Sequence, residues 1–309
     1  MTGGMFVPYS AVVIARALRQ RRVSRRALTD ALPRAAAVVP QPFDEREAVR
    51  VLVARGLDEG TIRTGSIGAG HLRFVDRAVR EHLRTEPPHR ALHVGNFVGV
   101  SLAALTGSML GVAGGSDPVV VSIDPNIPHI DINDPQTATM AVLTHFGYQP
   151  YNVVICGYSL EKSLGTDGFG TEEYEPERAF ATEAACENVL LSLAAVGLQL
   201  DVAVVDGSHN AAYLRRELEA IVPLLRVGAL LVLDDVTDAW AGIRDLFGEL
   251  GAPGSAWPLE ALDHDGRIGV LRRASTEAAG AVDAGGVEPA LAAERRGDDA
   301  IGRRSRARP

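Results

Sequence analysis

The sequence is poor in cysteine and has no excess of positive charge, and both absences narrow the class of protein. Its 309 residues include only two cysteines, Cys156 and Cys186, without the paired spacing of a metal site, so we expect reduced thiols in a cytoplasmic protein. The formal net charge of −8 at pH 7 argues against a general nucleic-acid-binding protein and leaves small ligands open.

Long apolar runs are also missing. A membrane-spanning helix needs roughly 18 or more consecutive apolar residues, and no window of this sequence approaches that length. In the opening stretch MTGGMFVPYSAVVIARALRQRR, the basic residues follow the apolar part, whereas in a secretory signal they precede it. We therefore expect neither a membrane span nor a secretory signal.

The residues that are present are typical of a globular protein of one or two domains, with 46% hydrophobic and 23% charged residues. Apolar residues recur at three- and four-residue spacing through residues 1–88, which predicts a helical N-terminal region ending at the prolines of TEPPHR. Residues 89–273 alternate strand-like and helical patterns, which predicts the main domain. Residues 274–309 are poor in large apolar side chains, which predicts a disordered tail.

The strand-like segments of the main domain are short and rich in Val, Ile and Leu. Near-continuous apolar strands that alternate with helices indicate a parallel sheet covered on both faces, so we predict an α/β fold with a Rossmann-like doubly wound sheet. Two more segments, at 255–262 and 266–274, have no long helix between them, which predicts an antiparallel hairpin at the sheet edge. The five parallel segments are ALHVGN (91–96), PVVVSIDPN (118–126), YNVVICGYS (151–159), LDVAVVDGSH (200–209) and GALLVLDDV (228–236).

The turn after the first predicted strand is a candidate site for a nucleoside. In HVGNFVGVS, Gly95 and Gly99 permit a tight turn and a close approach of a ligand, although a structural contact between helix and strand explains them equally well. Their spacing differs from the G-x-G-x-x-G of dinucleotide sites. Asp124, in SIDPN, could accept hydrogen bonds from both hydroxyls of a ribose; the alternative is a turn formed by Asp-Pro-Asn.

Carboxylates end two further predicted strands, with Asp206 in VDGSH and Asp234 and Asp235 in LVLDDV. Because parallel strands present their carboxyl ends at one edge of a sheet, we expect the three side chains to share a crevice. A hard divalent cation such as Mg²⁺ would relieve their repulsion. The alternative is that each aspartate caps the turn after its strand.

The motifs HVGNFVGVS, SIDPN, VDGSH and GALLVLDDV, in this order and spacing, resemble class I S-adenosylmethionine-dependent methyltransferases. The nearest resemblance is to the metal-dependent O-methyltransferases of the catechol, caffeoyl-CoA and macrolide-sugar types, over about residues 68–273. It implies a seven-stranded sheet with an antiparallel last strand, and S-adenosyl-L-methionine as the cofactor. The residues implied to bind the cofactor are Gly95, Gly99 and Ser101 at its methionine part, Asp124 at its ribose, Gly157, Tyr158 and Ser159 at its adenine, and also Asp206.

The resemblance also implies catalytic roles. It places the metal ligands at Asp206, Asp234 and Asp235, the last of which stands where the family often has Asn. His209, three residues after Asp206, falls at the position of the general base, which is Lys in catechol-type and His in sugar-modifying enzymes. A neutral imidazole can take a proton from a hydroxyl. The sequence departs from the family at His93, where an acid usually helps to hold the amino end of the cofactor.

We therefore expect a Mg²⁺-assisted O-methyltransferase that acts on a hydroxyl of a small molecule, with a natural-product sugar as first choice and a catechol-like aromatic as second. The N-terminal region would cover the acceptor site or mediate dimer contacts, and the Gly- and Glu-rich loop at 163–178 would act as a lid. Trp240 would line the acceptor pocket or pack against the core. Two competing hypotheses are a non-catalytic methyltransferase-like binding module, which His93 leaves open, and a nucleotide-dependent oxidoreductase, against which the glycine spacing and the carboxylates count.

Overall fold

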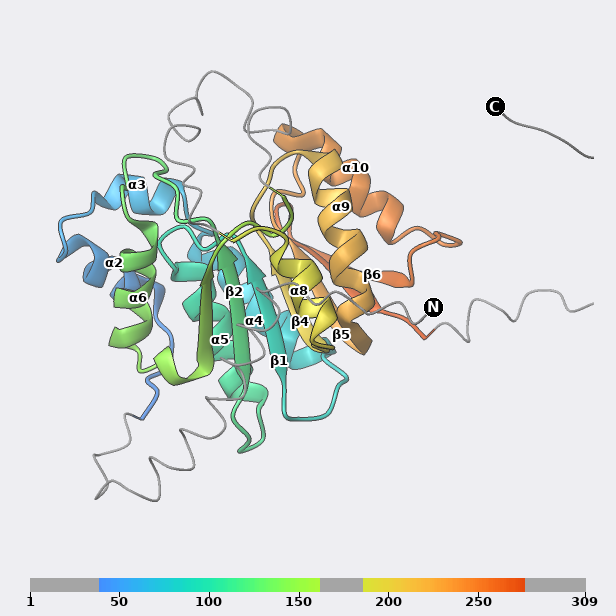
Figure 1. The fold of residues 1–309 in the computed structure, drawn as a ribbon, viewed down its shortest axis with the longest axis horizontal. Helices are drawn as coiled ribbons and strands as arrows, with labels where there is room; N and C mark the ends of the chain where they lie inside the picture. Colours follow the sequence, from blue (N-terminus) through green and yellow to red (C-terminus); the bar gives the residue numbers. More distant parts are fainter. Residues whose placement is uncertain (1–38, 162–185, 276–309) are drawn as a thin grey trace, which may run out of the picture.

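Seven strands form one mixed sheet in the order β3-β2-β1-β4-β5-β7-β6 (Figure 1). The computed structural model describes residues 39–161 and 186–275, so the expected lid at 163–178, nearly all of the expected tail and residues 1–38 of the predicted helical N-terminal region lie outside the described residues. The strands are β1 (Arg90–Val94), β2 (Val119–Asp124), β3 (Asn152–Cys156), β4 (Leu200–Val205), β5 (Leu225–Leu233), β6 (Leu259–His264) and β7 (Gly269–Arg273).

The first five strands are parallel and the last hairpin closes the sheet. β1 pairs with β2 on one side and with β4 on the other, and β5 continues the parallel set beside β4. β7 runs antiparallel to both β5 and β6. The predicted doubly wound sheet with an antiparallel last strand is therefore confirmed, and the predicted hairpin forms its edge beyond β5.

Helices cover both faces of the sheet (Figure 1). The helices are α2 (Glu45–Val53), α3 (Glu59–Thr64), α4 (Ala69–His82), α5 (Val100–Val112), α6 (Pro135–His145), α8 (Val189–Ala195), α9 (Ala211–Ile221) and α10 (Ala241–Leu250). Short 3₁₀ turns, η1 (Gln149–Tyr151), η3 (Val222–Leu224) and η4 (Asp238–Trp240), connect some of them to the strands. Among the described residues, no helix is long and apolar enough to cross a membrane.

The core divides into two layers because side chains alternate along each strand. On β4, Val202 and Val204 pack with α2, α4, α5 and α6, whereas Ala203 and Val205 pack with α8, α9 and α10. β5 alternates in the same way. A strand that is buried on both faces must be apolar throughout, which is why the continuous apolar runs of the sequence predicted β1 to β5.

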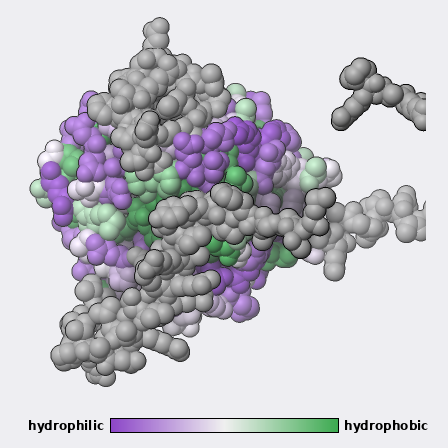
Figure 2. Space-filling model, viewed as in Figure 1, coloured by the Kyte–Doolittle hydropathy of each residue, from purple (hydrophilic) through white to green (hydrophobic). Residues whose placement is uncertain are grey.

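The described part of the N-terminal region shares the core of the sheet. Val49 and Leu52 of α2, and Val75 and Val79 of α4, belong to the same buried cluster as residues of β1, β4 and α5. Asp44 caps α2 by accepting a hydrogen bond at 2.9 Å from the backbone N–H of Glu47. Figure 2 shows the face of the molecule on which α8 and α9 lie. Hydrophilic residues gather toward the rim of this face, and hydrophobic residues are visible near its middle.

Candidate functional site at the carboxyl ends of the strands

The two glycines of the first loop are required by the backbone. Gly95 has φ +83°, and a Cβ on it would overlap the carbonyl oxygen of Asp206 in the loop after β4. Gly99 has φ +84° at the start of α5, and a Cβ there would lie 2.7 Å from the Cα of Thr139 in α6. Both positions favour glycine for a left-handed conformation and for a close contact within the protein. The structural explanation of the two glycines therefore holds, whether or not a ligand approaches the same loop.

Asp124 ends β2 and organises the same loop. Its Oδ2 accepts hydrogen bonds from the backbone N–H groups of Asn96 at 2.7 Å and Phe97 at 3.3 Å. Its Oδ1 accepts one from the N–H of Asn126 at 2.7 Å, which is the turn expected of Asp-Pro-Asn. Burial raises the pKa of this half-buried carboxyl, while the three N–H groups oppose the rise. Asp124 thus joins the ends of β1 and β2, where a carboxylate has further lone pairs for a ligand.

The residues predicted at the adenine lie in the loop after β3. The N–H of Gly157 donates to the carbonyl of Asp124 at 2.9 Å, and the N–H of Tyr158 donates to the carbonyl of Cys186 at 2.7 Å. The hydroxyl of Ser159 is hydrogen-bonded to Glu217 of α9 and lies 3.1 Å from the hydroxyl of Tyr213.

The hydroxyl of Ser159 is thus hydrogen-bonded inside the protein, in a buried group with Tyr213 and Glu217. Burial raises the pKa of Glu217 to about 7. The side chain of Ser159 is therefore engaged beneath the loop, between β3 and α9. Ser101, predicted at the methionine part of the cofactor, is buried in the first turn of α5.

The three predicted carboxylates meet at the ends of β4 and β5, but they have different partners. The guanidinium of Arg267 binds Asp234 at two points, with Nε 2.7 Å from Oδ1 and Nη2 2.7 Å from Oδ2. The side chain of Asp234 is 1% exposed. Asp235, with φ +58°, turns away from the strand, and its Oδ1 lies 3.4 Å from Nη2 of Arg267. Because Asp tolerates the left-handed region better than most residues, two adjacent aspartates can point to different sides.

Asp206 is the third member of this carboxylate group. Burial raises the pKa of Asp206 well above its usual value, and the like charges of Asp234 and Asp235 raise it further. The hydrogen bonds that Arg267 donates to Asp234 are the main cause that raises the pKa of the guanidinium. Three acidic side chains thus crowd at this point around the guanidinium of Arg267.

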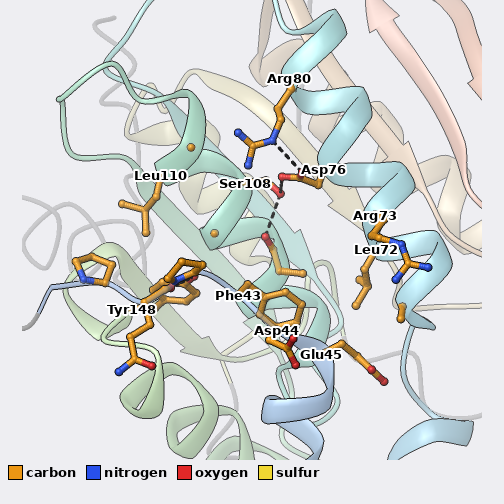
Figure 3. Close-up of a pocket in the computed structure, with 17 residues that line it drawn as sticks. Phe43, Asp44, Glu45, Leu72, Arg73, Asp76, Arg80, Ser108, Leu110 and Tyr148 are labelled. Atoms are coloured by element: carbon orange, nitrogen blue, oxygen red, sulfur yellow. Dashed lines mark hydrogen bonds and ion pairs between the residues drawn. The ribbon is translucent and has the colours of Figure 1, made fainter.

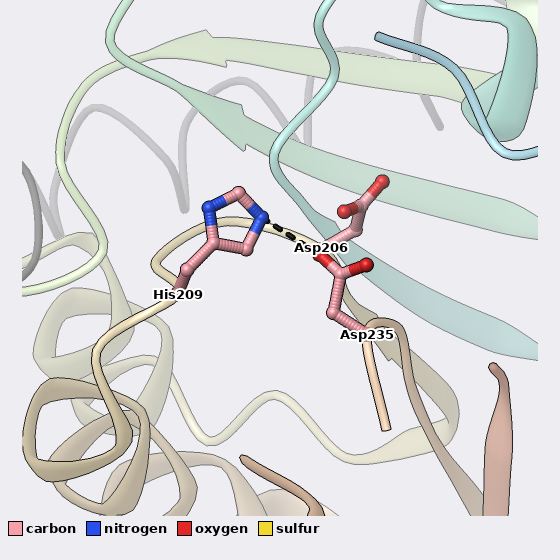
Figure 4. Close-up of side chains that lie close together, drawn as sticks. All are labelled: Asp206, His209 and Asp235. Atoms are coloured by element: carbon pink, nitrogen blue, oxygen red, sulfur yellow. Dashed lines mark ion pairs between the residues drawn. The ribbon is translucent and has the colours of Figure 1, made fainter. Parts of the chain in front are cut away.

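His209 lies beside this carboxylate group (Figure 4). Its Nε2 is 2.7 Å from Oδ2 of Asp235, while Nδ1 points away from the carboxylates. The indole of Trp240 stacks on the imidazole at 4.3 Å between ring centroids and 15° between planes. Asn210, next to His209, caps α9 by accepting N–H bonds from Ala212 and Tyr213. A hydrogen bond, a stacked ring and a capped helix thus fix the position of the imidazole.

Three of these side chains could hold a metal ion together. Asp206, His209 and Asp235 each place one donor atom so that all three atoms lie within 4.8 Å of one another. Carboxylate oxygens with an imidazole nitrogen suit a divalent cation. Asp234, which the sequence comparison placed among the ligands, is outside this group and is bound by Arg267. Of the three predicted ligands, Asp206 and Asp235 thus share the group with His209, and Asp234 makes the two shortest contacts with Arg267.

Arg267 is the residue of the site that sequence reasoning missed. It lies between β6 and β7, where its N–H donates to Oδ1 of Asp265 at 3.0 Å and its carbonyl accepts from the N–H of Val236 at 2.8 Å. Asp265 in turn contacts Nδ1 of His71 in α4 at 2.7 Å. The only signal in the sequence was an arginine in the turn of the predicted hairpin, next in space to the strand that carries LVLDD.

His93 is fully buried in the middle of the sheet, next to Ser122 of β2 and Val204 of β4. Burial lowers the pKa of His93 to about 4, and the nearby Asn96 side chain offsets the effect only in part. Within the described residues, neither ring nitrogen makes a hydrogen bond. A neutral imidazole therefore stands where the resembled family usually has an acid.

A cavity of about 540 Å³ lies elsewhere, between the segment before α2 and helices α4 and α5 (Figure 3). It contains none of the predicted site residues. Its charged groups are partly paired with one another, since Asp76 accepts from Arg80 at 2.9 Å and from Ser108 at 2.8 Å. The carboxylate group at the strand ends, and not this cavity, remains the candidate active site.

The sheet order, with the glycine loop after β1 and the carboxylates after β4 and β5, defines the class I methyltransferase fold. Residues 92–236, a little under half of the chain, match the family model Methyltransf_24, which is described as a methyltransferase domain. The resemblance to class I methyltransferases that the motifs indicated is thereby confirmed. No curated protein sequence matches the chain.

Solved structures with a similar course of the chain include three O-methyltransferases. The enzyme TomG from Streptomyces achromogenes, involved in tomaymycin synthesis, has 14% identity and a TM-score of 0.48, with 77% of this chain and 92% of that chain covered. An O-methyltransferase from Bacillus cereus has 15% identity and a TM-score of 0.46, covering 80% and 96%. CalS11, a TDP-rhamnose 3'-O-methyltransferase of calicheamicin biosynthesis, has 16% identity and a TM-score of 0.45, covering 74% and 92%.

Proposed function

We propose that the protein is an O-methyltransferase that moves the methyl group of S-adenosyl-L-methionine to a hydroxyl of a small molecule. The observation that carries the proposal is the contact of 2.7 Å between Nε2 of His209 and Oδ2 of Asp235, beside Asp206, at the mouth of a methyltransferase domain. A positioned imidazole next to carboxylates is the arrangement needed to remove a proton from a hydroxyl.

The cofactor, when bound, supplies a methyl group on a sulfonium that a nucleophilic oxygen can displace. Gly95 and Gly99 shape the loop that would receive its methionine part, and Asp124 would accept hydrogen bonds from its ribose. The adenine would lie against the loop of Gly157 and Tyr158. The net negative charge around Asp206 suits a ligand with positively charged sulfonium and ammonium groups.

His209 would act as the general base. Because Nε2 faces the carboxylate of Asp235, the proton of the neutral ring belongs on Nε2, and Nδ1 is left to accept the proton of the acceptor hydroxyl. The stacked indole of Trp240 and the carboxylate of Asp235 keep the ring from turning. Much of the catalysis would then be the alignment of the acceptor oxygen with the methyl group.

A divalent cation, Mg²⁺ in our proposal, would be held by Asp206 and Asp235, whose oxygens belong to the group within 4.8 Å. It would lower the pKa of a bound hydroxyl and orient it. A sugar hydroxyl is our first choice of acceptor because the base is His209, as in the sugar-modifying enzymes that the chain resembles. A catechol-like aromatic is the second choice. Trp240 is 39% exposed, so its indole could contact the ring of a sugar or of a catechol-like acceptor.

Calorimetric titration with S-adenosylhomocysteine and S-adenosyl-L-methionine, with and without Mg²⁺, tests the cofactor. A panel of glycosides and catechols, followed by the formation of S-adenosylhomocysteine, tests the transfer. His209→Ala should slow transfer by roughly 10²–10⁴ while the cofactor still binds. The matched control is His145→Ala, at the end of α6 beside Glu47, which should keep the full rate.

Each result has a clear consequence. The absence of cofactor binding at millimolar concentrations would refute the methyltransferase proposal. Binding without transfer to any member of the panel would favour a non-catalytic binding module instead. A full rate in His209→Ala would show that another group removes the proton. A rate unaffected by EDTA would remove the cation from the mechanism and leave the methyl transfer.

A further inference from the structure

One guanidinium lies inside the carboxylate group where the proposed cation would bind. Arg267 donates two hydrogen bonds of 2.7 Å to the two oxygens of Asp234 and lies 3.4 Å from Asp235. Paired contacts of this kind between a guanidinium and a carboxylate are among the strongest hydrogen bonds in proteins. Asp234 is 1% exposed, so water does not weaken the pair on its side.

The turn that carries Arg267 is tied down at several points. The carbonyl of Arg267 accepts from the N–H of Val236, two residues beyond Asp234. Asp265 accepts from the N–H groups of Arg267 and Ile268 at 3.0 and 2.8 Å. Its other oxygen contacts His71 of α4 at 2.7 Å. The guanidinium is thus part of the built site and not a surface side chain that happens to reach it.

We propose that Arg267 withholds Asp234 from the cation, so that Asp206 and Asp235 bind it and the guanidinium limits its affinity. This inference rests on the proposed function, since it concerns the cation of that site. The three carboxylates, if all are ionised, and Arg267 have a formal charge of −2, which one divalent cation balances. Because both oxygens of Asp234 already accept hydrogen bonds from Arg267, a cation at Asp234 would compete with the guanidinium for the carboxylate and would meet its positive charge.

Arg267 is therefore a positioning residue that sets which aspartate is a ligand and how tightly the metal binds. The strand geometry supports this division. The N–H of Asp234 continues the β4–β5 ladder by donating to the carbonyl of Val205 at 3.1 Å, whereas Asp235 has already left the strand with φ +58°. Nη2 of Arg267 thus lies closer to Asp234, at 2.7 Å, than to Asp235, at 3.4 Å, whereas Asp235 also contacts His209.

Mn²⁺ binding, followed by the loss of the free-ion signal in electron paramagnetic resonance, tests the proposal without any turnover. Arg267→Gln removes the charge and releases Asp234, so the site should bind Mn²⁺ at least about tenfold more tightly, within the range by which outer groups tune metal sites. Arg267→Lys keeps the charge but can hold only one oxygen of Asp234, and an intermediate gain is expected. Adding Asp234→Asn to Arg267→Gln should abolish the gain.

The matched control is Arg272→Gln on β7 of the same hairpin, whose side chain pairs with Glu260 at 2.5 Å. It should leave Mn²⁺ affinity unchanged. Thermal unfolding shows which variants are folded, and if Arg267→Gln is not, Arg267→Lys carries the test. An unchanged or weaker affinity in the folded Arg267 variants overturns the proposal, as does a gain that persists in the double variant.

The same preparations are titrated with S-adenosylhomocysteine, which separates the two claims. Binding of the nucleoside together with no effect of Arg267 on Mn²⁺ refutes the role of Arg267 and leaves the methyltransferase intact. Tighter Mn²⁺ binding in Arg267→Gln without nucleoside binding supports the role of Arg267 and refutes the proposed cofactor. If neither the wild-type protein nor the variants bind Mn²⁺, the cation site itself is refuted.

Discussion

The buried imidazole of His93 should make the protein lose stability in mild acid. The side chain is 0% exposed, and burial lowers its pKa from 6.5 to about 4. In the unfolded chain the imidazole takes a proton near pH 6.5, while in the folded protein it stays neutral down to about pH 4. Since the unfolded state then binds more protons, the free energy of unfolding must fall as the pH is lowered through this window.

The size of the effect follows from the two pKa values. A difference of about 2.5 pKa units corresponds to about 3.4 kcal/mol when the pH is below both values. At pH 5 the unfolded imidazole is mostly charged and the folded one mostly neutral, so about 2 kcal/mol of stability should be lost relative to pH 7. Above pH 7 the contribution of His93 to the pH dependence should vanish.

Urea unfolding from pH 7 to pH 5, on the wild-type protein and on His93→Leu, measures this difference. Other acidic and basic groups titrate in both proteins. The informative quantity is therefore the difference between the two proteins in how steeply the free energy of unfolding changes with pH. The wild-type protein should lose about 2 kcal/mol more than His93→Leu over this range. Equal slopes for the wild-type protein and His93→Leu would refute a neutral, solvent-free imidazole at this position.

Two further predictions concern the backbone and a buried ion pair. In the same urea assay, Gly99→Ala should destabilise the protein by more than about 1–2 kcal/mol, which is the cost of a left-handed backbone alone. The control is Gly248→Ala in α10, where a Cβ meets nothing within 4 Å, and it should be neutral or stabilising. Asp201→Ala should cost about 3 kcal/mol, since Asp201 is fully buried and binds Arg226 at 2.7 Å. Glu260→Ala, in a partly exposed pair with Arg272, should cost about 1 kcal/mol or less. A loss as small as that of the control would contradict either prediction.

The central sheet could be predicted from the sequence because each strand is covered on both faces. The segment GALLVLDDV illustrates the accuracy and its limit: the apolar run located β5, but the strand begins three residues earlier, at Leu225. Those first residues include the partly exposed Arg226 and the exposed Val227, and a register shift in β4–β5 lets Leu225 pair with Leu200. A local irregularity of pairing leaves no periodic signal in one sequence.

Two helices, α3 and α10, were not singled out within the regions that the sequence predicts to contain helices. α3 has six residues, too few for a repeat of apolar positions, and it begins at a cap in which Asp58 accepts from the N–H of Thr61. α10 has no side-chain cap at its start, where the chain leaves Trp240. Its buried residues Ile243, Leu246 and Leu250 do recur at three- and four-residue spacing, and they pack beside α9. The sequence therefore contained a short periodic signal for α10 and none for α3.

The sequence predicted which residues of the candidate site lie close together, but not which of them form hydrogen bonds or ion pairs with one another. Parallel topology alone brings Asp206 close to Asp234 and Asp235. The contacts that each of the two neighbouring aspartates makes depend on the positive φ of Asp235 and on Arg267, which is 33 residues from Asp234 in sequence. Repulsion among the carboxylates was a sound argument for a positive charge, but part of that charge is supplied by the protein itself.

The pairing of Asp234 with Arg267 crosses the boundary of the family match. Residues 92–236 contain every carboxylate of the site, whereas Arg267 lies in the hairpin beyond position 236. A fragment cut at that boundary would keep the acidic residues and lose both β7, which covers the edge of β5, and the guanidinium that holds a buried carboxylate. The last hairpin thus supplies the positive counter-ion of Asp234 as well as the edge of the sheet. A shortened or transplanted version of this domain therefore has to include the hairpin.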